Sequence, residues 1–268
     1  MFMDEARMGA RIDHPNVVPV IDVARSGEDA ILVLEYVHGV SLDVLMTEVF
    51  ESMGASDVTD ACYDGRVMAV IDDVSFESTR TMSQARFAEW VREHERWDPH
   101  RYELIMGRIV MNPPAGYPHG EVESRVQLAV AQHVRAQRLG RVFGSSQGFE
   151  LPTGDTLEPD LSFVSNERWS AGPRPEIGKF LRVVPDLVVE ILSTSTASRD
   201  RGEKKGVYER CGVREYWLVD WRAREIVVFT LEADRFGPER VFSERDRLES
   251  LVLAGIDLAV VESFPTEE

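Results

Sequence analysis

The chain has 268 residues, of which 43% are hydrophobic and 29% are charged, and its formal net charge is −17. This composition is typical of globular domains and excludes a chain that is disordered throughout. The acidic balance also excludes a protein that coats DNA by charge alone, because lysine and arginine supply most non-specific affinity for phosphate. A local basic cleft is still compatible with it.

The two cysteines, Cys62 and Cys211, predict neither a disulfide framework nor a zinc site, because they lack CxxC spacing. The first ten residues contain no apolar segment of the kind found in signal peptides. No stretch approaches the roughly eighteen apolar residues that span a bilayer. We therefore expect a cytoplasmic protein with no membrane partner.

The amino-terminal part predicts a helix followed by a hairpin. Residues 4–12 have helical spacing that ends at His14-Pro15, where proline forbids continuation. Two β-branched runs follow at 17–23 and 30–36, separated by a polar turn at 26–29. We treat residues 1–46 as one segment and residues 47–81, where periodicity weakens, as a linker with one possible strand at 66–71.

Residues 82–268 are predicted to form an independent α/β domain with a mixed sheet. A helix begins near Met82, and a hairpin turns at Met106-Gly107. A longer helix covers residues 121–139 and is expected to stop at Gly140. Further strands are expected around residues 148–151, 161–164, 187–192, 215–220 and 225–231, with a helix at 200–211 between the third and fourth.

Glu190 is the residue in this domain that most needs an explanation. It is the one charged residue of LVVEIL at 187–192, a segment typical of a central strand covered on both faces. A carboxylate buried there is costly unless it is paired or holds a cation. Asp160 opens the preceding strand, and two carboxylates from adjacent strands suit a hard ion such as Mg²⁺. Asp186 shares the face of Glu190 but is more simply explained as a structural residue after Pro185.

Lysines follow this strand on the next helix. Lys204 shares a helix face with Tyr208, whereas Lys205 is rotated by roughly 100°. Only one of them can therefore face the carboxylates. Such an ammonium would stabilise charge that develops on a phosphate oxygen. The alternative interpretations are a solvated lysine pair and a structural glutamate that pairs with an arginine.

Six segments of this domain form an ordered set of motifs. They are RYELIMGRIV (101–110), PHG (118–120), EPDLSFVS (158–165), VPDLVVEILS (184–193), EKKGVY (203–208) and GVREYWLVD (212–220). In this order they resemble the Uma-two family of restriction-endonuclease-like proteins, within the PD-(D/E)XK nuclease superfamily. The resemblance covers residues 82–264 and implies a restriction-endonuclease-like mixed sheet flanked by helices.

The resemblance implies a site in which Asp160, Glu190 and Lys204 are catalytic, with lysine moved to the helix because Leu192 occupies its usual position. It also implies roles for Glu103, which would join Asp160 and Glu190 in the metal shell, and for His119, which would contact phosphate. Mg²⁺ is the expected cofactor, with Mn²⁺ as a second option. The family commonly has Asp-Gly-Glu where this chain has Met-Gly-Arg at 106–108.

The amino-terminal segment resembles something else, part of the small lobe of a bacterial serine/threonine protein kinase. Residues 5–23 are similar to its helix C region, with Glu5 in the place of the helix C glutamate, and residues 32–45 are similar to the strand and hinge that follow. The glycine-rich loop, the strand lysine, HRD and DFG are all missing from the chain, so phosphoryl transfer lacks its parts. We expect a partial kinase-like segment, a remnant without kinase activity.

These observations predict a metal-dependent DNA endonuclease, a hydrolase of phosphodiester bonds. Homodimerisation would suit an enzyme that cuts both strands. The alternative is a non-catalytic interaction protein, or a vestigial gene fusion with a nuclease-like fold. The sequence does not distinguish DNA from RNA as the substrate.

Overall fold

The computed structural model describes residues 20–26, 29–34, 62–63, 66–67, 76–94, 101–112 and 116–266. The chain divides into two compact units, residues 1–74 and residues 75–268. Within the described residues, no helix combines the length and the apolar character that crossing a membrane requires.

The first unit contains two short antiparallel pairs. Strands β1 (Val20–Ser26) and β2 (Asp29–Leu34) form the hairpin that the sequence predicts. Strand β3 (Cys62–Tyr63) pairs with β4 (Arg66–Val67). The helix expected at residues 4–12 lies outside the described residues, so the resemblance to a kinase stays a prediction.

The second unit begins with a five-stranded sheet in the order β5-β7-β6-β10-β9. Its edge strand β5 (Phe76–Thr81) lies within residues 47–81, which were expected to be a linker. The polar sequence FESTRT conceals this strand, because an edge strand needs fewer apolar residues than a central one. The described second unit therefore starts one strand earlier than residue 82. The other strands are β6 (Arg101–Ile105), β7 (Arg108–Asn112), β9 (Phe149–Glu150) and β10 (Thr156–Leu157).

The β6–β7 turn falls at Met106-Gly107, as predicted. Both residues have positive φ, 49° and 78°, which is the backbone of a two-residue hairpin turn. Helix α3 (Gln84–His94) precedes this hairpin and buries Phe87 and Val91 against it. The local sequence thus sets the hairpin that carries two site residues, Arg101 and Glu103.

A seven-stranded sheet in the order β15-β14-β13-β12-β11-β8, with β16 beside β14, forms the rest of the unit. Only β12 and β13 are parallel, so the sheet is mixed, as predicted. All five residues of β12 are buried, as expected of a central strand. The strands are β8 (Gly140–Gly144), β11 (Leu161–Ser165), β12 (Leu187–Ile191), β13 (Glu215–Asp220), β14 (Glu225–Glu232), β15 (Arg235–Phe236) and β16 (Arg240–Ser243).

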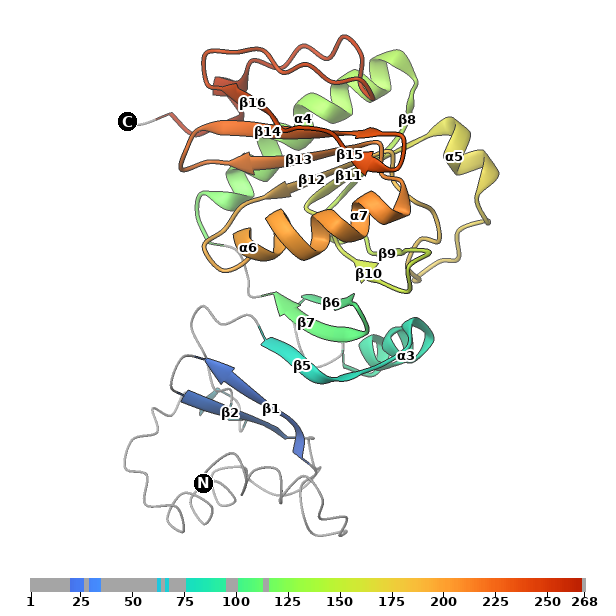
Figure 1. The fold of residues 1–268 in the computed structure, drawn as a ribbon, viewed down its shortest axis with the longest axis vertical. Coiled ribbons are helices and arrows are strands. Elements are labelled where there is room, and N and C mark those ends of the chain that lie inside the picture. Colours follow the sequence, from blue (N-terminus) through green and yellow to red (C-terminus); the bar gives the residue numbers. More distant parts are fainter. Residues whose placement is uncertain are drawn as a thin grey trace. The chain divides into compact units, whose positions relative to one another are not determined.

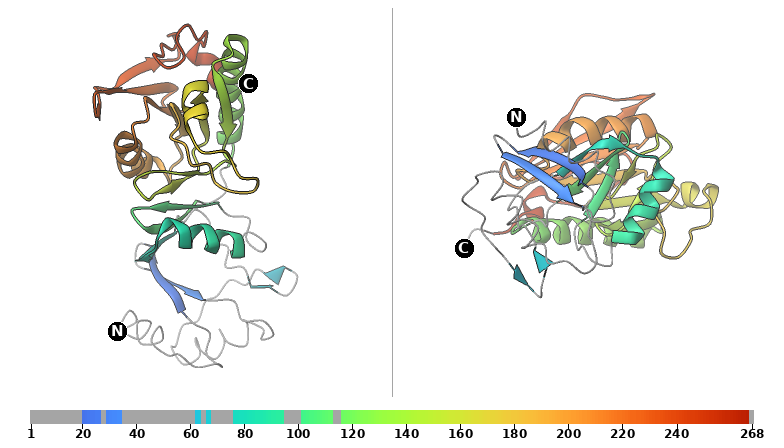
Figure 2. Two further views of the ribbon diagram at one scale, coloured as in Figure 1. Left: turned by 90° about the vertical axis from the view of Figure 1, so that its right-hand side faces the viewer. Right: turned by 90° about the horizontal axis from the view of Figure 1, so that it is seen from below.

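Helices cover both faces of this sheet (Figures 1 and 2). Helix α4 (His119–Gln137) lies on one face and buries its valines there. The other face is covered by α6 (Ala197–Arg199), the π-helical segment η1 (Asp200–Lys204) and α7 (Lys205–Cys211). Two short elements complete the unit, α5 (Asn166–Ala171) and the 3-10 helix η2 (Val260–Ser263).

The stop of helix α4 differs from the expectation. Arg138, not Gly140, caps the helix in the left-handed conformation, with φ 55°. Gly140 is instead the first residue of β8, where a Cβ atom would lie 2.1 Å from the carbonyl oxygen of Val164. Glycine is therefore required at this position by the close approach of β8 to β11, and the helix ends without it.

Candidate active site

Two buried carboxylates lie side by side where β11 and β12 pair. Leu161 is opposite Val189 in this antiparallel pair, and one step further along the same register Asp160 is opposite Glu190. Both side chains are almost fully buried, with 6% and 3% of the residue exposed. The structure therefore brings together the two carboxylates that the sequence paired.

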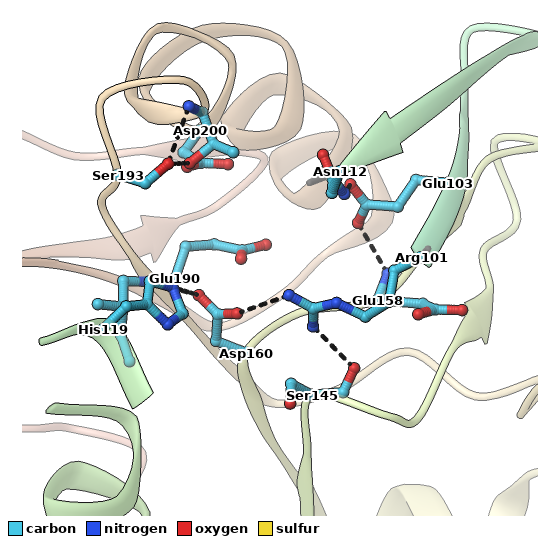
Figure 3. Close-up of polar contacts among 12 residues, drawn as sticks. Arg101, Glu103, Asn112, His119, Ser145, Glu158, Asp160, Glu190, Ser193 and Asp200 are labelled. Carbon is cyan, nitrogen blue, oxygen red and sulfur yellow. Dashed lines mark hydrogen bonds and ion pairs between the residues drawn. The ribbon is translucent and has the colours of Figure 1, made fainter. Parts of the chain in front are cut away.

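Two donors and one more distant guanidinium surround the carboxylate of Asp160. Its Oδ2 atom accepts a hydrogen bond of 2.8 Å from the backbone N–H of Ile191 and lies 3.3 Å from Nε2 of His119. Its Oδ1 atom lies 3.7 Å from a guanidinium nitrogen of Arg101. Figure 3 shows the carboxylate between His119 and Arg101.

These donors decide the charge of Asp160. Burial alone raises the pKa of a carboxyl group, but the contacts with His119, the N–H of Ile191 and Arg101 outweigh it, so the pKa of Asp160 is lowered. In return, Asp160 raises the pKa of His119 against the opposing effect of burial. Asp160 is therefore ionised in a buried place, which suits a ligand for a cation.

Glu190 has the opposite environment. Its Oε1 atom accepts a hydrogen bond of 2.9 Å from the hydroxyl of Tyr208 and lies 2.8 Å from Nζ of Lys204. Burial, together with the nearby carboxylates of Asp200, Asp160 and Glu103, raises the pKa of Glu190 well above its ordinary value despite Lys204.

Lys204 occupies the centre of the buried charges. Its Nζ atom lies 3.0 Å from Oε1 of Glu103 and 3.7 Å from Oδ1 of Asp200, in addition to Glu190. Burial lowers the pKa of Lys204, but these three carboxylates raise it more, so the side chain is an ammonium. Lys205 points elsewhere, with its Nζ atom 4.0 Å from the centre of the Phe229 ring. Only one of the two lysines faces the carboxylates, as predicted.

Glu103 reaches the site from β6 of the other sheet and is completely buried. Its Oε1 atom also accepts a 2.8 Å hydrogen bond from the N–H of Glu158, and its Oε2 atom accepts one of 2.7 Å from the amide of Asn112. Asn112 in turn accepts a 3.3 Å hydrogen bond from Arg199. These contacts favour a role in holding Lys204 over the role in the metal shell that was expected of Glu103.

Sequence reasoning missed Asp200 and Arg101. Asp200 stands four residues before Lys204, a spacing that places both on one side of a helix, and burial raises its pKa to about 6. Arg101 stands two residues before Glu103, a spacing that places both on one face of a strand. Both spacings are visible in the sequence, but neither distinguishes a residue of a buried site from an ordinary surface charge.

Asp186, which shares the face of Glu190, is structural, as the sequence suggested. Its Oδ2 atom accepts a 2.7 Å hydrogen bond from the N–H of Ser165, and its Oδ1 atom lies 3.3 Å from Nε of Arg168. Tyr216 and Trp217 are fully buried core residues. The candidate site is therefore the group around Asp160 and Glu190.

The buried charges fit a divalent cation. Four carboxylates, those of Glu103, Asp160, Glu190 and Asp200, share the site with Lys204, Arg101 and His119. Burial raises the pKa values of Glu190 and Asp200, and the neighbouring carboxylates add to this effect. Figure 3 shows Asp160, Glu190 and Glu103 directed into one space from three strands. Two arrangements could hold a metal. One is the carboxylate pair of Asp160 and Glu190. The other is His119, Glu123 and Asp160, the one group of three among the described residues whose ligand atoms lie within 4.8 Å of one another.

The described residues thus define a mixed α/β protein with a buried acidic site that includes a lysine. The model of the Uma2 family, described as "Putative restriction endonuclease", matches residues 91–261, more than half of the chain. The chain belongs to this family. No curated protein matches the sequence.

Among solved structures, the chain is similar to a putative nuclease of the DUF820 group from Anabaena variabilis ATCC 29413, determined at 1.96 Å resolution. The two sequences are 20% identical, and the TM-score is 0.55. The similarity covers 68% of this chain and 97% of the other. It confirms the predicted fold class. The family match leaves residues 1–90 aside, so it does not bear on the kinase-like segment.

Proposed function

We propose that the chain is a metal-dependent endonuclease that hydrolyses phosphodiester bonds in DNA. The observation that supports this most is the geometry of its centre, where the buried carboxylates of Asp160 and Glu190 lie side by side and the ammonium of Lys204 lies 2.8 Å from Glu190. Membership of a restriction-endonuclease family supports the same reaction class.

Asp160 and Glu190 would hold the ion, because hard divalent cations such as Mg²⁺ and Mn²⁺ prefer carboxylate oxygens. When bound, the ion supplies positive charge and a polarised water next to the phosphate. Lys204 supplies a fixed positive charge in a place from which bulk water is excluded, where charge stabilisation is strongest. The imidazole ring of His119, which Asp160 holds in place, would contact the phosphate.

In this proposal, Glu103 keeps Lys204 in place. An isolated ammonium at 4% exposure needs carboxylate partners on more than one side, and Glu103 supplies the partner from the opposite sheet. Glu103 itself is fixed by the N–H of Glu158 and by Asn112. Its two oxygens are thus already engaged with donors of the chain.

The first test is calorimetric titration of the full chain with Mn²⁺ and Mg²⁺, followed by cleavage assays on supercoiled, linear and single-stranded DNA. We expect Asp160→Asn and Glu190→Gln to lose both metal binding and cleavage. Glu123→Gln distinguishes an ion held by Asp160 and Glu190 from one held by His119, Glu123 and Asp160. It weakens metal binding only in the second case. Asp186→Asn serves as the control for removal of a buried carboxylate outside the site.

Two outcomes would contradict the proposal. A wild-type chain that binds no divalent cation and cuts no form of DNA supports the alternative, a non-catalytic protein with a nuclease-like fold. Cleavage that persists unchanged in Glu190→Gln would remove the site from the mechanism. Cleavage of RNA in place of DNA would keep the chemistry and change the substrate. Two further predictions stay open. ATP turnover checks that the chain has no kinase activity, and sedimentation checks that it forms a homodimer.

A further inference from the structure

Arg101 is the most exposed cation of the active site. Its side chain keeps 32% of its surface accessible, whereas Lys204 keeps 5% and His119 keeps 9%. One of its nitrogens donates a 3.0 Å hydrogen bond to the carbonyl oxygen of Ser145, which keeps the guanidinium beside the site. Of these three cations, Arg101 therefore offers the most surface to a ligand from solvent.

The pairing of Arg101 with Asp160 is loose. The 3.7 Å between the guanidinium nitrogen and Oδ1 of Asp160 exceeds the length of a hydrogen bond. Asp160 already has two closer donors on its other oxygen, the N–H of Ile191 and the ring of His119. A guanidinium has five N–H donors in a planar fork that matches two oxygens of a phosphate, so most of its hydrogen-bonding capacity is unused by Asp160.

We propose that Arg101 is a phosphate-binding residue, which balances the charge of Asp160 in the free protein and turns its guanidinium to a non-bridging phosphate oxygen of the nucleic acid when Asp160 holds a cation. This inference rests on the proposed nuclease function and adds a residue that touches the substrate. It follows from the position of the guanidinium, next to the acidic centre and open to solvent.

The proposal has two consequences of opposite sign. A cation beside Asp160 repels a divalent ion at that carboxylate, so removing the charge of Arg101 strengthens metal binding. The same change removes a phosphate contact, so it weakens DNA binding. A residue that only supports the fold would weaken both together.

The test compares Arg101→Gln and Arg101→Lys with the wild-type full chain. In a Mn²⁺ titration without DNA, we expect Arg101→Gln to lower the dissociation constant by about threefold or more. DNA binding is measured by the anisotropy of a short labelled duplex in the presence of Ca²⁺, and gels check that the duplex is intact. We expect the DNA dissociation constant of Arg101→Gln to be about tenfold higher than that of the wild type. The slope of log affinity against log salt should shrink by about 0.9, the value of one phosphate contact.

Arg174→Gln is the matched control. It removes the same charge from an exposed arginine on the loop between α5 and β12, and among the described residues no contact joins it to the site. Arg101→Lys keeps the charge but loses the planar fork, so we expect wild-type Mn²⁺ affinity with weakened DNA binding. Thermal unfolding of each variant shows whether the fold persists.

The outcomes separate the two proposals. If the wild type cuts DNA, but Arg101→Gln binds DNA and Mn²⁺ as Arg174→Gln does, the role of Arg101 is overturned and the nuclease stands. If the wild type cuts no nucleic acid, the nuclease proposal fails. The Mn²⁺ titration still decides in that case, because unchanged affinity in Arg101→Gln would show that the guanidinium does not oppose a cation at Asp160.

Discussion

The face of the seven-stranded sheet under α4 and the face under α7 are built from the same strands but bury different groups. Towards α4, alternate residues of β12 are Leu187, Val189 and Ile191, and they join an apolar core. Towards α7, β12 directs Val188, Glu190 and Leu192, and Glu190 meets Lys204 and Tyr208.

The difference shows how one strand serves stability and chemistry at once. Burial of apolar groups is non-directional and tolerates some change of partner, because its contribution follows the area removed from water. Burial of charges tolerates little, because each charge left without its partner costs several kcal/mol. We therefore expect substitutions on the two faces to have different signatures, and the following variants test this.

The largest effect is expected for Lys204→Met. It leaves Glu103 and Glu190 buried without their shared cation, which should lower the free energy of unfolding by about 4 kcal/mol, measured by urea denaturation. The control Lys205→Met removes an ammonium that rests on the Phe229 ring and should cost about 1 kcal/mol or less. Equal urea midpoints for the two variants would show that the charges around Lys204 are solvated and not tightly coupled.

A second substitution tests the coupling directly. In the double variant Lys204→Met with Glu190→Gln, one of the unpaired carboxylates is removed as well. We expect it to regain about 1 kcal/mol or more relative to Lys204→Met alone, because residues in contact are not additive. Strict additivity in urea denaturation would argue against the ion pair.

On the apolar face, Leu187→Ala should cost about 3 kcal/mol, the usual range for a fully buried leucine. Its side chain faces α4, away from the carboxylates, so the Mn²⁺ affinity of the folded protein should equal that of the wild type. Urea denaturation and calorimetry on the same sample check both statements. A loss of metal affinity would mean that the two faces are coupled through β12.

A smaller effect is expected from Tyr208→Phe. It removes the hydroxyl that donates a 2.9 Å hydrogen bond to Glu190. A hydrogen bond to a charged group contributes about 2 kcal/mol to the free energy of unfolding. Tyr216→Phe is the matched control, because the hydroxyl of Tyr216 donates a 3.0 Å hydrogen bond to the neutral carbonyl oxygen of Asp200. Its removal should cost about 1 kcal/mol. The reverse order in thermal unfolding would indicate that Glu190 carries no charge in the folded protein.

The smallest effect belongs to Arg125→Ala on the outer side of α4. Arg125 pairs with Glu121 one helical turn away, at 2.7 Å, with both side chains more than a third exposed. Such pairs contribute about 0.3–0.5 kcal/mol and weaken with salt. Denaturation at low and high ionic strength measures this, and a loss above about 1 kcal/mol would show that Arg125 has a further role in packing.

The sequence by itself predicted much of the fold and named most residues of the candidate site. The apolar run at 187–192 predicted a central strand, because a strand covered on both faces needs apolar residues at successive positions. Met106-Gly107 predicted the hairpin, because few residues adopt positive φ. Asp160, Glu190, Lys204, Glu103 and His119 were all named as candidates, and the structure brings them together.

Only the tertiary structure decided which charged side chains pair with one another. Lys204 pairs with Glu103 across a separation of 101 residues, and Arg101 reaches Asp160 from the other sheet. Such pairings depend on the register of strands and on how two sheets meet, and neither leaves a local pattern in the sequence. For the same reason the polar strand β5 looked like a linker, because its place at a sheet edge is a property of its neighbours.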